Sequence, residues 1–397
     1  MSLGTRGSSA PAAAGRHPRR PATGRGSDAP RLTRLTSTSL DAGQPSRRLR
    51  PTAPAFGLDS RFNSRARRRR VDLPRASCLS RLRPPNRALR MTETATEQAL
   101  PPRPQPKAML EVLHPITWFP PMWAFTCGVV SSGVDVLAHW GLLIAGIILT
   151  GPLVCATSQV VNDWYDRDVD AINEPNRPIP SGRLPGLWGY KMAVAGTVLS
   201  LMVGAALGLW VFLATVVGLI FAWIYSAPPL RLKNNGWLGN AAVGFSYETL
   251  AWITGAAVML GGAMPDERIL WLALLYGLGA HGIMTLNDFK AIEGDRQLGI
   301  RTLPVQLGVK AAAWVACVVM MTPQFIVVGF LFAWVQPVHG AAVAGLVMVQ
   351  GVLMLRFLEN PVQRATWLSG LGVTVYVTGM MISAFAVRAA IAGNTPL

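Results

Sequence analysis

Asn162-Asp-Trp-Tyr-Asp-Arg-Asp-Val-Asp170 directly follows an apolar run, 142–161, that carries no charge and is long enough to cross a bilayer. Asn162, Asp166 and Asp170 are spaced so that a helix would carry their side-chain oxygens on one face over two turns. A carboxylate at mid-bilayer costs about 2.5–3.5 kcal/mol, so acids at a membrane boundary usually serve a function. Such a cluster suits a hard cation such as Mg²⁺, with a phosphate completing the coordination shell.

A second acidic cluster, Asn287-Asp-Phe-Lys-Ala-Ile-Glu-Gly-Asp295, closes a later apolar run. Both clusters begin with Asn-Asp, which suggests an internal repeat that brings two helix ends together around one site. We therefore predict one metal-binding and catalytic site from both clusters. Its candidate residues are Asn162, Asp166, Asp170, Asp288 and Asp295.

Charge divides the chain into two unlike parts. Residues 1–90 contain 21 Arg, no Lys and four acidic residues, so their net charge of +17 equals that of the whole chain. Residues 91–397 are therefore neutral overall, which argues against a nucleic-acid-binding body. The segment 1–90 is rich in Pro, Ser, Ala and Gly and has few large apolar residues, so we expect it to be disordered.

Three interpretations of residues 1–90 compete. The segment is a basic tail attracted to anionic lipid, a transit peptide, or upstream DNA translated from a start codon placed too early. We favour the third, because Arg without Lys is typical of GC-rich coding bias and Met91 offers a later start. Residues 91–114 would then be a lead to a membrane domain over 115–392.

From about residue 115 the chain alternates apolar runs of about 17–25 residues with short polar breaks, which is the length that spans a bilayer. This pattern predicts an all-α integral membrane protein with about nine transmembrane helices. Position 209 is a weak boundary, because 188–226 has no charge except Lys191. The predicted spans are 116–134, 140–162, 188–208, 210–226, 238–261, 269–287, 309–334, 338–357 and 366–390.

Basic residues are distributed unequally between the predicted loops. Of the 16 basic residues in 91–397, only Arg268 and Arg388 fall outside the lead and the loops that follow even-numbered spans. The positive-inside rule then places the N-terminus, the even-numbered loops and both acidic clusters in the cytoplasm.

Basic side chains in these loops are candidates for holding a diphosphate. Arginine offers a fork of donors to phosphate oxygens, and the prolines of 174–183 and 225–233 would stiffen two of the loops. The alternative is that these residues only anchor the loops by the positive-inside rule. The candidates are Arg177, Arg183, Arg231, Lys233 and Lys290.

Several longer segments resemble a known family. Nine spans and two cytosolic Asp-rich motifs are the pattern of the UbiA prenyltransferases, and the resemblance covers about 110–390. Within that family the chlorophyll synthase branch is most similar, and within the branch 118–123 and 279–288 are most similar to bacteriochlorophyll synthases. The segments that carry the resemblance are 116–123, 162–182, 225–240, 279–288 and 287–299.

The resemblance implies a helical bundle around a central cavity, Mg²⁺ as the cofactor, and esterification of a tetrapyrrole. A C20 prenyl group would pass from geranylgeranyl or phytyl diphosphate to the propionate carboxylate of bacteriochlorophyllide. That carboxylate is ionised near neutral pH, so the reaction needs no strong general base. The alternatives are chlorophyll synthesis, prenylation of a quinone or haem, and an ion transporter that uses the acids as ion sites.

The resemblance also implies a membrane location and protein partners for the enzyme. It predicts the cell inner membrane or an intracytoplasmic photosynthetic membrane, with a geranylgeranyl reductase and other pigment-pathway or light-harvesting proteins as partners. Candidate residues for a flat pigment pocket are Trp118, Phe119, Tyr225 and His281. The competing interpretations are an aromatic belt at the interface and, for His281, a polar residue paired inside the bundle.

The second cluster departs from the family pattern. Many UbiA enzymes have Asp-x-x-x-Asp ending where Asp295 stands, but position 291 is Ala in this chain. Asp288 and Asp295 are seven residues apart and would still share roughly one face of a continuous helix. We therefore expect a shifted or weaker second metal site, with Glu293 as a substitute ligand.

Overall fold

The computed structural model describes residues 103–393, so the expectations for 1–90 fall outside the described part of the chain. Within 103–393 every regular element is a helix, and the β-structure is limited to an isolated bridge between Asn235 and Arg301. The prediction of an all-α protein is confirmed.

Seven helices in the described residues are long and apolar enough to cross a membrane. The first is continuous over Trp140–Asn173 and consists of α3 (Trp140–Ile148), the π-helical η2 (Leu149–Cys155) and α4 (Ala156–Asn173). The others are α5 (Trp188–Ala206), α6 (Leu209–Ser226), α9 (Glu267–Asp288), α12 (Val309–Ala333), α13 (Pro337–Glu359) and α14 (Pro361–Gly393).

Two more helical segments occupy the remaining predicted spans. One is the 3₁₀ turn η1 (Pro115–Trp118) with α2 (Phe119–Ser131), and the other is α7 (Gly236–Gly244), the π-helical η4 (Phe245–Leu250) and α8 (Ala251–Met259). Gly208, with φ 117°, separates α5 from α6, which confirms the boundary near 209 because this backbone region favours glycine.

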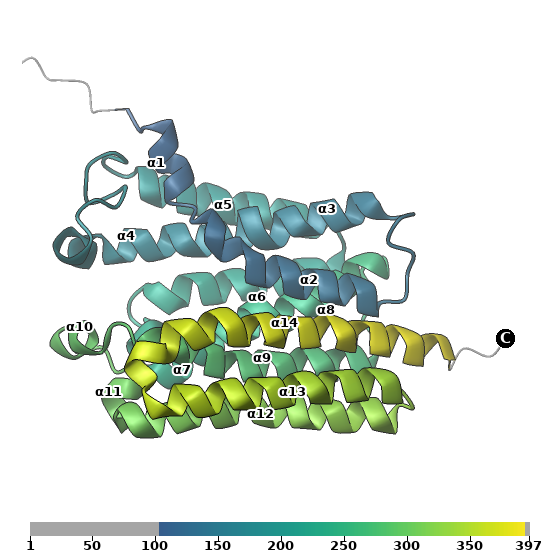
Figure 1. Ribbon diagram of the computed structural model, residues 1–397. Helices are drawn as coiled ribbons and strands as arrows, with labels where there is room; N and C mark the ends of the chain where they lie inside the picture. The colour runs from purple at the N-terminus through teal and green to yellow at the C-terminus, as the bar shows by residue number, and fades with distance from the viewer. Residues whose placement is uncertain (1–102, 394–397) are drawn as a thin grey trace, which may run out of the picture. The chain divides into compact units, whose positions relative to one another are not determined.

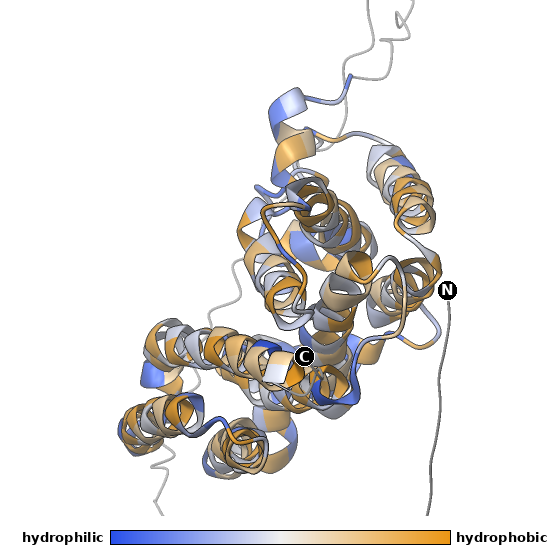
Figure 2. Ribbon diagram, turned by 90° about the vertical axis from the view of Figure 1, so that its right-hand side faces the viewer, coloured by the Kyte–Doolittle hydropathy of each residue, from blue (hydrophilic) through white to orange (hydrophobic). Residues whose placement is uncertain are grey.

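Large apolar side chains cover the outside of the long helices. Met348, Leu355, Phe325 and Trp314 are more than half exposed, which would be costly in water and is expected against lipid. Figure 2 looks along the bundle, and hydrophobic colour runs through the long helices while much of the strong blue lies in connecting segments. The protein is therefore a multi-pass integral membrane protein.

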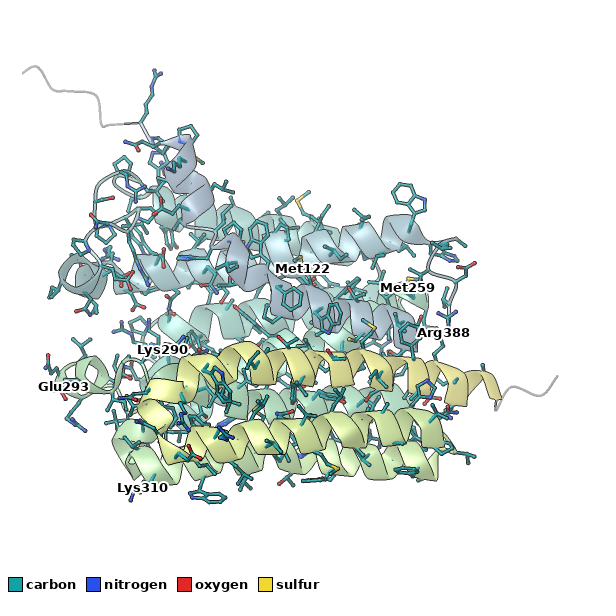
Figure 3. The ribbon with its side chains drawn as sticks, viewed as in Figure 1. Met122, Met259, Lys290, Glu293, Lys310 and Arg388 are labelled. Carbon is teal, nitrogen blue, oxygen red and sulfur yellow. The ribbon has the colours of Figure 1, made fainter. Side chains whose placement is uncertain are left out.

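The short helices and both acidic clusters gather at one end of the bundle. Figure 1 shows α1 (Pro106–Glu111), α10 (Ile292–Gln297) and α11 (Leu303–Leu307) at the end opposite the C-terminus. Figure 3 shows Lys290, Glu293 and Lys310 at this end and Arg388 at the other. This separation agrees with the charge asymmetry of the loops.

Two π-helical segments, η2 and η4, interrupt long helical stretches of the chain. Pro152 within η2 has no N–H to donate to the preceding turn, which explains the irregular hydrogen bonding there. No such proline lies in η4, where the sequence reads Phe-Ser-Tyr-Glu-Thr-Leu. Such wide turns are frequent at functional sites, and both segments face the internal cavity described below.

Candidate active site

The first acidic cluster lies on an uninterrupted helix. α4 continues through the motif to Asn173, so the predicted placement of Asn162, Asp166 and Asp170 on one helical face is confirmed. The Asn162 side-chain amide donates to Ser226 Oγ at the end of α6, at 3.0 Å. This hydrogen bond engages the amide nitrogen of Asn162 and leaves its carbonyl oxygen to accept from another group or to bind a cation.

Asp166 is paired with two of the predicted diphosphate-binding residues. Its carboxylate accepts hydrogen bonds from Arg231, at 2.8 Å, and from Lys233 in the short 3₁₀ helix η3 (Leu232–Asn234). Burial lowers the pKa of Lys233, and the Asp166 carboxylate opposes that shift. Arg231 has a left-handed backbone, with φ 39°, which is costly for a residue other than glycine and fixes how its loop turns.

Arg177 joins two carboxylates of α4. Its guanidinium donates to Asp163 at 3.2 Å and to Asp170 at 3.0 Å. Asp163 also pairs with His114 at 3.0 Å, and its side chain is only 3% exposed. Sequence reasoning missed Asp163 and His114. The seven-residue spacing of Asp163 and Asp170 was a signal for the first, but nothing in the sequence marked the second.

The His114–Asp163 pair predicts a pH-dependent stability. The hydrogen bond to Asp163 raises the pKa of His114 above its usual 6.5, against the opposing effect of burial. The stabilisation is therefore complete below about pH 6.5 and is lost as the pH rises through the raised pKa. We expect the melting temperature in detergent to fall between about pH 6 and 9, and to fall less in His114→Ala. His139→Ala, an exposed control, should keep the wild-type slope; equal slopes in all three proteins would refute the assignment.

Two predicted diphosphate-binding residues lie apart from this cluster. Arg183 pairs with Glu111 of α1 at 2.6 Å, and this hydrogen bond is the main cause that raises the pKa of the Arg183 guanidinium. Lys290 is exposed and takes part in none of the ion pairs found in the described chain. The structure therefore groups Arg177, Arg231 and Lys233 with the acids.

The second cluster is divided between two helices. α9 ends at Asp288 and α10 begins at Ile292, so the expectation that Asp288 and Asp295 share a face of one helix is wrong. Asp288 accepts from Asn240 at 3.1 Å and Asp295 accepts from Thr302 at 3.0 Å. Burial raises the pKa of Asp295, and the hydrogen bond from Thr302 opposes the shift.

The two acidic clusters differ in their charge compensation. Each carboxylate of the first cluster has a cationic partner, whereas within residues 103–393 neither Asp288 nor Asp295 takes part in an ion pair. Glu293, the proposed substitute ligand, is exposed and pairs with Arg296 at 2.9 Å. The carboxyl groups of Asp288 and Asp295 are thus held by neutral donors, Asn240 and Thr302.

Backbone contacts tie the cation-bearing loop to the second cluster. The N–H of Gly236 donates to the carbonyl of Arg301 at 2.8 Å, and the N–H of Arg301 donates to the carbonyl of Asn234 at 2.9 Å. A side chain at Gly236 would come within 2.6 Å of the Leu303 nitrogen, so glycine is required for this approach. Asn235 caps α7 by accepting from two backbone N–H groups.

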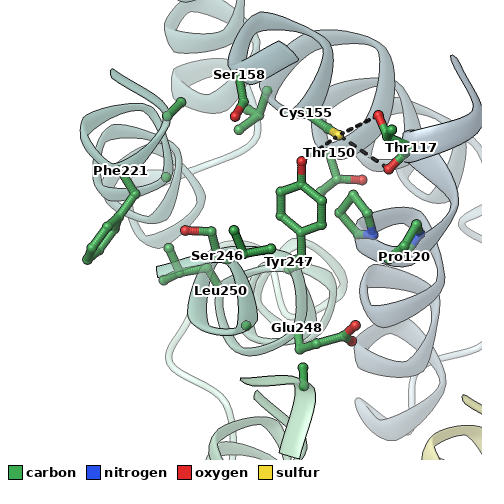
Figure 4. A pocket seen from close by; sticks show the side chains of 18 of the residues that line it. Thr117, Pro120, Thr150, Cys155, Ser158, Phe221, Ser246, Tyr247, Glu248 and Leu250 are labelled. Carbon is green, nitrogen blue, oxygen red and sulfur yellow. Dashed lines mark hydrogen bonds between the residues drawn. The ribbon is translucent and has the colours of Figure 1, made fainter. Parts of the chain in front are cut away.

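An internal cavity of about 470 Å³ adjoins the acidic end. Helices from both halves of the chain line it, and Figure 4 shows part of its wall. The size is typical of small-molecule sites in proteins. Its polar lining residues include Gln159, Asn162, Tyr225, Tyr247, Glu248 and Asn287.

The predicted pigment-pocket residues divide into two pairs. Phe119 and Tyr225 line the cavity. Trp118 donates its indole N–H to the carbonyl of Leu113 at 2.8 Å, and it is not among the described residues of the wall. His281 is buried beside Trp237, with ring centroids 5.6 Å apart, and it is likewise absent from the described lining.

This geometry defines a class of protein: a membrane-embedded helical bundle with an apolar cavity whose wall includes Asn162 and Asn287, the first residues of the two acidic clusters. Residues 118–387 match the UbiA prenyltransferase family, and the chain belongs to that family. It is a prenyltransferase.

Individual relatives agree with the family assignment. The chain is 54% identical over 287 residues to "Bacteriochlorophyll synthase 33 kDa chain" of Rhodobacter capsulatus, covering 72% of this chain and 94% of that protein. It is 38% identical over 299 residues to "Chlorophyll synthase, chloroplastic" of Oryza sativa, covering 70% and 76%. The solved UbiA homolog from Archaeoglobus fulgidus bound to DMAPP and Mg²⁺ has the same fold, with a TM-score of 0.54, 20% identity and coverage of 71% and 99%.

The donor set fits Mg²⁺ by its chemistry. Carboxylate and amide oxygens are hard ligands, and Mg²⁺ usually takes one or two carboxylates while phosphates and waters complete its shell. No group of three or more His, Cys, Asp or Glu side chains in residues 103–393 has the geometry of a complete metal site.

Proposed function

We propose that this chain is a bacteriochlorophyll synthase. It transfers a C20 prenyl group from geranylgeranyl or phytyl diphosphate to the propionate carboxylate of bacteriochlorophyllide, with release of diphosphate. The observation that carries the proposal is the apolar cavity whose wall includes Asn162 and Asn287, the first residues of the two acidic clusters. The names of the 53–54% identical relatives support the acceptor.

At the acidic end, one set of residues would bind the metal ion and another would bind the phosphate oxygens. Mg²⁺, when bound, would neutralise charge that develops on the leaving diphosphate. Asn162, Asp166 and Asp170 on α4, with Asp288 and Asp295 opposite, would hold it. Arg177, Arg231 and Lys233, which pair with α4 carboxylates, would bind the phosphate oxygens.

The cavity would hold the reacting ends of both organic substrates away from water. Apolar walls favour an allylic chain and a macrocycle alike. The acceptor carboxylate is ionised near neutral pH, so the chain need not supply a base. Positive loops at the acidic end support a cytoplasmic orientation of the site. We propose the inner or intracytoplasmic photosynthetic membrane as its location, where pigment-pathway and light-harvesting proteins would be neighbours.

A two-substrate assay tests this function. Membranes that contain the chain, given bacteriochlorophyllide, geranylgeranyl diphosphate and Mg²⁺, should form the prenyl ester, which mass spectrometry identifies. Replacing the acceptor by 4-hydroxybenzoate or haem should give no prenylated product, and EDTA should stop ester formation. Prenylation of either alternative acceptor without ester formation would refute the proposal, as would ion transport that needs no diphosphate.

A further inference from the structure

One wall of the cavity carries polar atoms that have no partner. Six side-chain nitrogen and oxygen atoms in residues 103–393 are buried without a hydrogen bond, and two of them line the cavity: Ser246 Oγ and Glu248 Oε2. Both belong to the π-helical η4. Glu248 is only 6% exposed.

Tyr247, the residue between them, does have hydrogen-bond partners. The hydroxyl oxygen of Tyr247 accepts from Gln159 at 3.0 Å and from Cys155 at 3.3 Å. Figure 4 shows Tyr247 directed toward Thr150 and Cys155, whereas Glu248 points toward the helix that carries Pro120. The missing partners of Glu248 and Ser246 are thus specific to their positions and are not a general property of η4.

The chemistry of Glu248 restricts what can bind there. None of the ion pairs in the described chain involves Glu248. Burial of an isolated ionised carboxylate costs far more than burial of a neutral acid, so the group is expected in its neutral form. A neutral carboxyl has one O–H to donate, and a serine hydroxyl has another. A carbonyl oxygen with its two lone pairs is a matching acceptor.

We propose that Glu248 binds a carbonyl substituent on the macrocycle of the tetrapyrrole acceptor. This inference rests on the proposed function. The prenyl chain of the donor is pure hydrocarbon and has no hydrogen-bond acceptor for Glu248 or Ser246. We therefore assign the η4 wall to the binding of the acceptor. Gln159, which holds Tyr247, lies one turn before Asn162 on α4. An acceptor held at η4 is therefore beside the helix that carries the first acidic cluster.

Substitutions at Glu248 test the site through the two Michaelis constants. Glu248→Leu should raise the KM for bacteriochlorophyllide about tenfold, the equivalent of one hydrogen bond, and leave the KM for geranylgeranyl diphosphate within about twofold. Glu248→Gln keeps a donor and should stay within about threefold of wild type. Gln350→Leu is the matched control, since it removes another buried, unpartnered polar side chain that does not line the cavity; its acceptor KM should not change.

A vibrational measurement gives an independent answer. The carbonyl stretch of bound bacteriochlorophyllide, recorded by resonance Raman, should lie below that of the unbound pigment in wild type and return toward it in Glu248→Leu. An unchanged acceptor KM in the Leu variant, or equal changes in both KM values, would overturn the proposal. Should the Leu variant not fold, an unshifted carbonyl in wild type would overturn it instead. Failure of the proposed function looks different, because wild type would then form no ester from bacteriochlorophyllide.

Discussion

Asp166→Asn should lower kcat/KM for prenyl transfer by at least about 10³-fold while the protein still inserts into membranes. Metal ions on a leaving diphosphate contribute several kcal/mol, and each 1.36 kcal/mol corresponds to a factor of ten in rate. The substitution removes one carboxylate from the face of α4 and leaves Arg231 and Lys233 without their acidic partner. The measurement is initial rate of ester formation against Mg²⁺ concentration, with membrane content checked by immunoblot.

Asp168→Asn is the matched control for this experiment. Asp168 lies on the same helix but its side chain is 86% exposed, and its contact with Arg167 is long, at 3.9 Å. The control should keep wild-type activity within about twofold, because exposed pairs of this kind contribute little. An Asp166→Asn enzyme that retained a tenth or more of its activity would remove Asp166 from the metal site.

Lys233→Met should reduce kcat/KM for the diphosphate substrate on the order of 10²-fold, as loss of one preorganised charged donor usually does. Lys233 is well buried, and it shares Asp166 with Arg231. We expect the KM for geranylgeranyl diphosphate to rise and the KM for bacteriochlorophyllide to stay constant. Lys233→Arg keeps the charge and should recover part of the loss.

Lys310→Met controls for charge at the same end of the bundle. Lys310 is exposed at the start of α12, and Figure 3 places it near Lys290 and Glu293. Its loss should change the diphosphate KM by less than about twofold. If Lys233→Met and Lys310→Met behaved alike, Lys233 would act only through the general positive charge of this face.

Hydropathy was sufficient to predict the helices, because a lipid environment forces every spanning segment to satisfy its own backbone. The spacing of Asn162, Asp166 and Asp170 also predicted their common face, since α4 is regular there. The same reasoning gave a wrong prediction for Asp288 and Asp295 in the second cluster. Its helix ends at Asp288, and nothing in the residue spacing shows that a turn precedes α10.

Contacts between residues that are distant in the sequence could not be predicted from the sequence alone. The pairing of Asp163 with His114 depends on how the lead packs against α4. Loop geometry likewise decides that Arg177 pairs with Asp170 and that Lys233 pairs with Asp166. Glu248 did leave a signal, as the one charged residue in the predicted span 238–261. A lone acid within a span marks a functional candidate, and its unsatisfied oxygen became evident only from the packing.

The short pairing of Asn235 with Arg301 has a consequence for biogenesis. Asp166, Arg231 and Lys233 leave the ribosome well before Asp288 and Asp295, so the nascent chain first presents an acidic helix with its own counter-ions. The later carboxylates arrive without counter-ions and are brought beside the earlier loop by a few backbone hydrogen bonds. The second cluster can therefore join the loop of Arg231 and Lys233 only after residue 301 has been synthesised, whereas the cationic partners of the α4 carboxylates precede it in the chain.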